Sequence, residues 1–462
     1  MPSRQDQLHS YQYSLQRVVA ALVTHDPDPS RSPLRRAGMT AMVSLLIAAL
    51  AVGAAAIYGL LTGHTNVNPT DPNVVFQEKG SGARYVYLDS DDKLHPVLNY
   101  TSGLLLAGSE APQLKSISAD KLAGVPLGPP LGIPDAPDSL PRKNALLTER
   151  WSVCTDNQAD DGAPRATLLV GEKITDGTVA ATAGKALLVR EPSGQTSLVF
   201  NNRRFVIPAD RLVASLRALG WADQQPWAVS VAWANAVPRG PDLAAPGIPD
   251  LGDESDAAEF AVGQLVVDNG GQYYVVLRDG VAALTDMQAK LMQAAGAGRV
   301  EEIGAEFVQI PESKTRVSDA NSADGLPADI PALTEGTPAR VCMTLPVDPK
   351  TGDGIRINPT VPAGALVTAE RETPNSVLAD YVHVARGRGV LAVSAASPSA
   401  PVSTGTATVV TDTGLGYPLA NRTLITKLGY GGVKPRQIPA ELMTLLPKGP
   451  SLDPQRARTA LQ

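Results

Sequence analysis

The longest apolar stretch of the chain runs from Ala37 to Gly63 and contains no charged side chain. A helix of this length rises roughly 40 Å, whereas the hydrocarbon core of a bilayer needs only about 20 residues. Arg35 and Arg36 directly precede the stretch, and the next Lys or Arg is Lys79. Because basic residues stay on the cytoplasmic side, we expect the N-terminus in the cytoplasm and the C-terminal part outside it.

A cleaved signal peptide is the alternative, because Ala54-Ala55-Ala56 is similar to a small-residue cleavage site. The apolar stretch is much longer than the usual signal-peptide core, however, and residues 1–36 precede it. We therefore predict one uncleaved transmembrane helix over residues 37–63, which makes the chain a single-pass membrane protein.

The cytoplasmic segment, residues 1–36, has a helical pattern from about Gln5 to Thr24, and Asp26-Pro27-Asp28-Pro29 ends it. Its apolar positions alternate by three and four residues and form one stripe: Leu8, Tyr11, Leu15, Val18 and Leu22. So short a segment has no core of its own, so lipid or a partner must cover the stripe. The helix either lies on the inner membrane surface or docks against a partner's helix, and the pattern leaves both open.

Beyond a polar spacer, residues 64–78, four segments have the pattern of a β-hairpin. Each has β-branched or aromatic residues on both sides of a turn rich in Asp, Asn or Gly. They begin at Arg84, Thr196, Tyr273 and Ala407. Between the hairpins lie short helical patterns, such as the segment from Leu284. Each unit is thus a hairpin with one or two helices, and it is small enough to need a neighbour.

A second pattern recurs after the hairpins. ISADKLAGVPLGPPL from Ile117 and IPAELMTLLPKGPSL from Ile438 share six of fifteen residues, and VSVAWANAVPRGPDL from Val229 has the same ending. The shared Gly-Pro-x-Leu signature consists of Gly128, Pro129 and Leu131; Gly240, Pro241 and Leu243; and Gly449, Pro450 and Leu452. The third unit along the chain keeps only Ile310-Pro311. Internal duplication explains this spacing better than chance.

We therefore expect an α+β fold with a transmembrane helix and an elongated exported part. The four repeats are predicted at residues 79–143, 194–255, 256–333 and 401–462. The remaining pieces, 144–193 and 334–400, have strand-like alternation and form one central mixed β domain. If the chain leaves this centre and returns to it, the first repeat pairs with the fourth and the second with the third.

Each piece of the central domain contains one of the two cysteines, Cys154 and Cys342. In an oxidising compartment an even pair of cysteines indicates a disulfide. Closing so long a loop stabilises a fold by roughly 5 kcal/mol in the chain-entropy model. Two separate buried thiols are the alternative, and the exported location disfavours it.

The formal net charge is −6, and aromatic residues make up only 4% of the chain. Few aromatic residues favour several small cores over one large core. Residues 1–36 contain five Arg and three Asp, a charge of +2, so the remainder carries −8. This acidic balance excludes a nucleic-acid partner, which would require clustered Lys and Arg.

The sequence contains no recognisable catalytic, cofactor or metal site. The nearest approach to a phosphate-binding loop, Gly177 to Gly184-Lys185, has the wrong glycine spacing and Ala186 in place of Ser or Thr. His95 and His383 lie in strand patterns and do not form a zinc site. Asp89, Asp91 and Asp92 lack the later residues of a calcium loop and are predicted to form a solvated hairpin turn.

Taken together, these features resemble EccB, the membrane component of the actinobacterial type VII (ESX) secretion system. The resemblance near the N-terminus lies in Gln7-Leu8, Tyr11-Gln12, Arg17, Ala21-Leu22-Val23, Asp26 and Pro33-Leu34-Arg35-Arg36. Further along it lies in Tyr85-Val86, the segment 94–99, the segment 128–134, Trp151, Cys154 and the segment 446–450. It covers essentially the whole chain.

The resemblance implies a structural, non-enzymatic subunit that anchors and oligomerises the periplasmic layer of the secretion machine in the inner membrane. The partners it implies are the EccC ATPase, the membrane subunits EccD and EccE, other EccB copies, a mycosin protease and peptidoglycan. ATPase activity has been proposed within the family. The alternatives are therefore an extracytoplasmic nucleotide hydrolase and a cell-wall-binding module.

Overall fold

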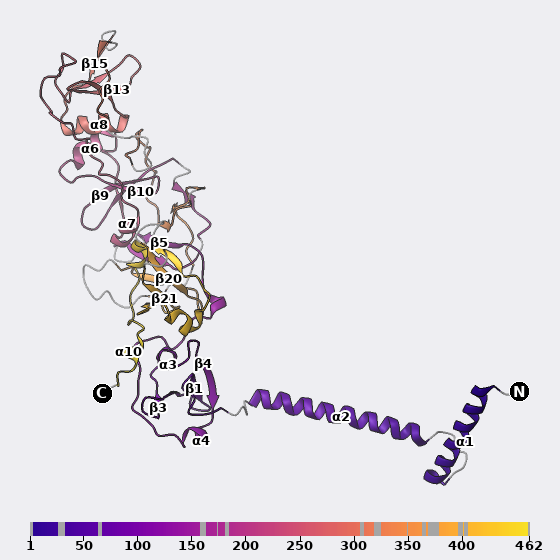
Figure 1. Ribbon diagram of the computed structural model, residues 1–462. Coiled ribbons are helices and arrows are strands. Elements are labelled where there is room, and N and C mark those ends of the chain that lie inside the picture. Colours follow the sequence, from indigo (N-terminus) through magenta and orange to yellow (C-terminus); the bar gives the residue numbers. More distant parts are fainter. Residues whose placement is uncertain are drawn as a thin grey trace.

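The structure is a computed structural model (Figure 1). It describes residues 3–25, 33–62, 67–157, 163–172, 174–180, 184–304, 309–317, 325–348, 350–362, 366–367, 378–395, 401 and 405–460. Two N-terminal helices lie apart from an elongated body, which we define as the described residues from 67 to 460.

The two N-terminal helices are α1 (Arg4–Thr24) and α2 (Pro33–Thr62). A capping box between Ser3 and Asp6 starts α1, and His25 in the left-handed conformation ends it. Asp26 to Pro29, predicted to break the helix, lie outside the described residues. Within α2, Gly38–Gly59 are long and apolar enough to cross a membrane, with a mean hydropathy of 2.3. The side chains of Arg35 and Arg36 are not described.

Within the described residues, four four-stranded sheets share one topology. The first strand of each lies between an antiparallel second strand and a parallel fourth strand, and the second and third strands form a hairpin. We name the four units repeats 1 to 4. Repeat 1 contains β1 (Val74–Glu78), β2 (Arg84–Leu88), β3 (Lys93–Pro96) and β4 (Gln113–Ile117). Repeat 2 contains β8 (Leu187–Arg190), β9 (Thr196–Phe200), β10 (Arg203–Val206) and β11 (Trp227–Ala228).

The other two repeats follow the same plan. Repeat 3 contains β12 (Leu265–Val267), β13 (Tyr273–Leu277), β14 (Gly280–Ala283) and β15 (Glu301–Glu302). Repeat 4 contains β20 (Val390–Ala395), β21 (Ala407–Val410), β22 (Gly416–Pro418) and β23 (Arg436–Pro439).

A helical segment follows the third strand of every repeat: α3 (Tyr100–Leu106), α6 (Leu212–Ala218), α8 (Asp286–Ala295) and the π-helical turn η3 (Thr426–Tyr430). A second short helix follows the fourth strand in repeats 1, 2 and 4: α4 (Ala119–Leu122), α7 (Val231–Ala236) and α9 (Ala440–Met443). The 3₁₀ turn η1 (Lys143–Ala145) lies between repeat 1 and the central domain in the sequence, and α10 (Pro454–Ala457) lies near the C-terminus.

The central domain is a mixed seven-stranded sheet in the order β18-β19-β6-β5-β16-β17-β7. Its strands are β5 (Trp151–Asp156), β6 (Arg165–Leu169), β7 (Thr178–Val179), β16 (Arg340–Leu345), β17 (Ile355–Ile357), β18 (Leu366–Val367) and β19 (Tyr381–His383). The predicted disulfide is confirmed, because Cys154 on β5 and Cys342 on β16 are bonded directly across the antiparallel pair.

The cores show which units pack together. The largest joins the central sheet to α7 of repeat 2 and α9 of repeat 4, through fully buried Trp233 and Leu442. A second core is shared by repeats 1 and 4, and a third by repeats 2 and 3. The units therefore follow one another along the body as repeat 3, repeat 2, central domain, repeat 4 and repeat 1, with repeat 1 nearest to α2 (Figure 1).

Several expected boundaries differ from the structure. β1 lies inside the predicted spacer 64–78, while β8 and β20 lie in segments assigned to the central domain. All three are the first strands of repeat sheets, paired with strands of their own repeat. The alternation of β8 and β20 predicts strands, but an apolar strand does not reveal its partner, and β1 was assigned to the spacer.

Candidate functional site

The apolar stripe of α1 is uncovered in the single chain. Its side chains keep between 49% and 74% of their surface exposed: Leu8, Tyr11, Leu15, Val18 and Leu22. By contrast, Ala20 on the same helix is buried. A capped helix that presents a continuous apolar stripe to water is typical of an interaction surface, because burial of such side chains stabilises association.

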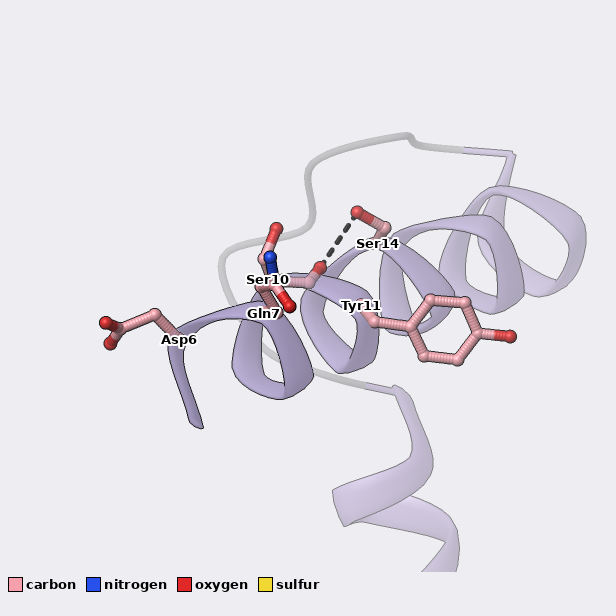
Figure 2. Close-up of a pocket in the computed structure, with 5 residues that line it drawn as sticks. All are labelled: Asp6, Gln7, Ser10, Tyr11 and Ser14. Atoms are coloured by element: carbon pink, nitrogen blue, oxygen red, sulfur yellow. Dashed lines mark hydrogen bonds between the residues drawn. The ribbon is translucent and has the colours of Figure 1, made fainter. Parts of the chain in front are cut away.

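The other candidate surface on α1 is a shallow hollow beside the stripe (Figure 2). It measures about 420 Å³ and is lined by Asp6, Gln7, Ser10, Tyr11 and Ser14. The Ser14 hydroxyl donates to the Ser10 carbonyl at 2.9 Å, so it satisfies its own helix. Because one helix supplies all five residues, the hollow does not enclose a substrate, and we interpret it as the polar border of the stripe.

The Gly-Pro-x-Leu signature forms a recurrent backbone contact with the third strand of its repeat. In repeat 1 the Leu94 N–H donates to the Pro126 carbonyl, and the Gly128 N–H donates to the Leu94 carbonyl, both at 2.9 Å. The same pair of bonds joins Arg204 to Pro238 and Gly240, Val281 to Pro311 and Ser313, and Gly416 to Pro447 and Gly449. The segment thus adds an extra partner to the hairpin edge in all four repeats.

The glycine in this contact makes room for a ring. The residue after the paired strand position places its ring on the glycine: His95 on Gly128, Phe205 on Gly240 and Tyr417 on Gly449. A Cβ atom at these glycines would lie 2.3, 2.5 and 2.3 Å from a ring atom, which is far inside van der Waals contact. We call this ring-and-glycine arrangement the glycine seat. The sequence pattern reveals the glycines but not the rings that require them.

Repeat 3 shows the same rule in reverse. Its residue after the paired position is Ala282, which has no ring, and Ser313 stands where the other repeats have glycine. The loss of the signature in the third unit therefore accompanies the loss of the ring. Comparing the four hairpins position by position could have revealed this pairing from the sequence.

The signature leucines fill the shared cores. Leu131 and Leu452 lie in the core between repeats 1 and 4, and Leu243 lies in the core between repeats 2 and 3. All three are buried. The Pro129 carbonyl contacts the His95 ring at 2.9 Å, and Pro241 and Pro450 occupy the same place after their glycines. The signature is thus a packing element.

The junction of repeats 1 and 4 is held by direct contacts between them. The buried Tyr430 hydroxyl donates to the Pro141 carbonyl at 2.8 Å, and burial raises the pKa of Tyr430 above its usual range. Lys427 donates to the Ala107 carbonyl at 2.7 Å. Leu131 also pairs with Ala460, so the C-terminal segment crosses from repeat 4 to repeat 1.

The comparisons with known proteins agree with this architecture. Over residues 1–462 the chain matches the family described as "Type VII secretion system ESX-1, transport TM domain B". The chain belongs to this family, the EccB proteins.

Related proteins and structures extend the assignment. "ESX-3 secretion system ATPase EccB3" of Mycobacterium tuberculosis is 26% identical over 485 residues, which cover 96% of this chain and 87% of the relative. The EccB3 protein of Mycolicibacterium smegmatis is 31% identical over 304 residues. That match covers 62% of this chain and 56% of the relative's length.

Two solved structures have the same fold. One is a chain of an intact ESX-5 inner membrane complex, with a TM-score of 0.67 at 22% identity, covering 100% of this chain and 96% of that chain. The other, from an EccB3 dimer of the ESX-3 core complex, has a TM-score of 0.62 at 24% identity and covers 84% and 100%. Family membership and the apolar helix α2 support a single-pass protein of the inner membrane.

Because the EccB3 relatives are named ATPases, the geometry around the nearest phosphate-loop candidate matters. A Cβ on Gly177 would meet the Ile357 carbonyl at 2.8 Å, so the backbone at Gly177 packs closely against β17. Lys185 lies 3.9 Å from the Glu335 carboxylate. Residues 181–183 between them lie outside the described part. Among the residues that the structure describes, no group of three or more His, Cys, Asp or Glu side chains could hold a metal ion.

Proposed function

We propose that this EccB chain is a structural, non-enzymatic subunit of a type VII secretion machine. α2 anchors it in the inner membrane with the N-terminus in the cytoplasm, and the body belongs to the periplasmic layer. The observation that carries the proposal is the capped helix α1, whose five apolar stripe residues have no cover in the single chain. Arg35 and Arg36 before the span support this orientation, and a disulfide in the central domain fits an oxidising compartment.

The charge of α1 favours a protein partner over the lipid surface. Helices that lie on anionic membranes usually carry many Lys and Arg on the polar face. α1 has only Arg4 and Arg17 as basic residues, against Asp6, and the Arg17 guanidinium stacks on Tyr13 at 5.9 Å. We therefore propose that the stripe packs against a helix of another subunit, with EccC, EccD and EccE as the candidates.

The test of this docking is a double substitution, Leu15→Asp with Val18→Asp, in cells that make the whole complex. We expect the variant to reach the membrane but to be lost from the complex when it is extracted in mild detergent, because two carboxylates cannot be buried in an apolar contact. Gln5→Asp with Gln16→Asp is the matched control, since it adds the same charge at exposed positions outside the stripe and the hollow. Retention of the stripe variant at the control level would refute the docking.

The enzyme alternative needs its own measurement. We expect the purified full-length chain to release phosphate from ATP no faster than buffer, and Lys185→Ala to leave that background unchanged. Co-purified ATPase is the main source of error, so the chain should be assayed after separation from the complex. Hydrolysis that rises with EccB concentration and falls in the Lys185 variant would show that the chain is an enzyme.

A further inference from the structure

Two histidines of the body are buried against carboxylates. His95 has only 3% of its surface exposed, and its Nε2 lies 3.0 Å from Asp91 Oδ2. His383 is 9% exposed, and its Nε2 lies 2.9 Å from Glu172 Oε1. The two sites look alike on this side of the ring.

They differ at the other ring nitrogen. His95 Nδ1 lies 2.9 Å from the Pro129 carbonyl oxygen, whereas His383 Nδ1 is buried and has no hydrogen-bond partner among the described residues. A carbonyl and a carboxylate only accept hydrogen bonds, so both nitrogens of His95 must donate. The doubly protonated imidazolium alone does this. His383 needs a single donor, which a neutral ring supplies.

The sister repeats show that packing does not require this charge. Phe205 and Tyr417 occupy the same glycine seat in repeats 2 and 4, and both are buried without ionising at neutral pH. His95 therefore adds to repeat 1 a contact whose strength depends on a proton. The ring joins the hairpin turn that carries Asp91 to the segment that carries Gly128.

Carboxylates predominate among the charged groups around His95. On its own hairpin His95 shares the turn with Asp89, Asp91, Asp92 and Lys93. The facing segment, residues 127–131, contains no charged side chain, and α4 before it carries exposed Asp120 and Lys121. Desolvation alone would raise the pKa of Asp91, but the hydrogen bond and charge of His95 lower it below its ordinary value.

We propose that Asp91, His95 and the Pro129 carbonyl form a protonation-dependent latch in repeat 1, the repeat nearest to the membrane-spanning helix. With His95 protonated, the latch holds the hairpin turn on the Gly-Pro segment. Loss of the proton leaves one N–H for two acceptors, so the ring can no longer donate to both Asp91 and the Pro129 carbonyl, and the contact between the turn and the Gly-Pro segment is weakened. The contribution of the latch is thus larger when the ring is protonated, so it falls as the pH rises.

Hydrogen exchange of the full-length protein in detergent tests the latch directly. We expect residues 89–96 and 127–131 to lose protection severalfold between pH 5.5 and pH 8, after correction for the intrinsic rate, while β5 and β16 stay protected. This measurement needs no variant. Equal corrected protection of both segments across the pH range would overturn the proposal.

Variants then assign the effect to the ring. His95→Phe and His95→Tyr reproduce the seats of repeats 2 and 4, so we expect them to fold and to show no pH-dependent protection. Asp91→Asn should also flatten the profile, and His383→Gln is the control that should leave it unchanged. A profile that persists in the His95 variants, or that disappears in the His383 variant, would assign the pH dependence elsewhere and refute the latch.

Discussion

At the scale of single residues, the residue type at a repeated position depends on the side chain that packs against it. Gly449 is required because the Tyr417 ring lies on it, and Ser313 is tolerated because Ala282 has no ring. A signature that reads as Gly-Pro-x-Leu along the sequence is thus half of a contact. The other half lies about 30 residues earlier, on the hairpin.

This contact predicts a specific non-additivity. Gly449→Ala should destabilise the full-length protein by about 1–3 kcal/mol, because the new methyl group has no space beneath the Tyr417 ring. In a Tyr417→Ala background the same substitution should cost much less. Chemical denaturation of the two single variants and the double variant measures the coupling. Additivity within about 0.5 kcal/mol would show that ring and glycine are energetically independent.

At the scale of elements, the sequence was informative where the signal is local. Hairpins, the stripe of α1 and the apolar helix depend on neighbouring residues, and the structure has α1 at Arg4–Thr24, where the pattern predicts a helix from about Gln5 to Thr24. The first strands of repeats 1, 2 and 4 were assigned to other segments because their parallel partners lie tens of residues away. β8, for example, pairs with β11 after a hairpin and a helix have intervened.

The packing of the short helices was also not predicted, although the sequence carries a signal for it. Trp233 in α7 and Leu442 in α9 are fully buried on the central sheet, and the aligned residue of α4 is the exposed Lys121. A charged residue at this position marks the helix that does not face the centre. The sequence pattern does not show which surface covers Trp233, because that surface consists of residues distant in the sequence.

The disulfide gives a prediction at this scale. It joins two strands that are 188 residues apart in sequence, so its removal should cost up to about 5 kcal/mol in the chain-entropy model. We expect Cys154→Ala with Cys342→Ala, like reduction of the wild type, to lower the melting temperature of the body. Thermal unfolding with and without reductant measures this, and the double variant should be insensitive to reductant. A reductant effect of equal size in the variant would trace the loss to something other than the bridge.

At the scale of the whole molecule, the chain leaves the central sheet and returns to it, so every repeat shares its core with a neighbour. Repeat 3 lies at the far end of the body (Figure 1). Its α8 contributes Met287 and Leu291 to the core shared with repeat 2, while Ala289 and Met292 belong to its own core. One helix thus contributes to two cores. Substitutions on one side of α8 should affect the stability of repeat 3 alone, and substitutions on the other side should also affect its packing on repeat 2.

Adjacent residues of α8 therefore make a matched pair. Leu291→Ala and Met292→Ala each remove a buried side chain, and each should cost about 2–5 kcal/mol locally. Hydrogen exchange should show opening of repeat 3 in both variants, but opening of α6 and the segment around Trp221 in repeat 2 only for Leu291→Ala. The central strands β5 and β16 should remain protected, because their core does not include α8. If both variants reduce the protection of repeat 2 equally, the two cores do not act separately, and repeats 2 and 3 open together.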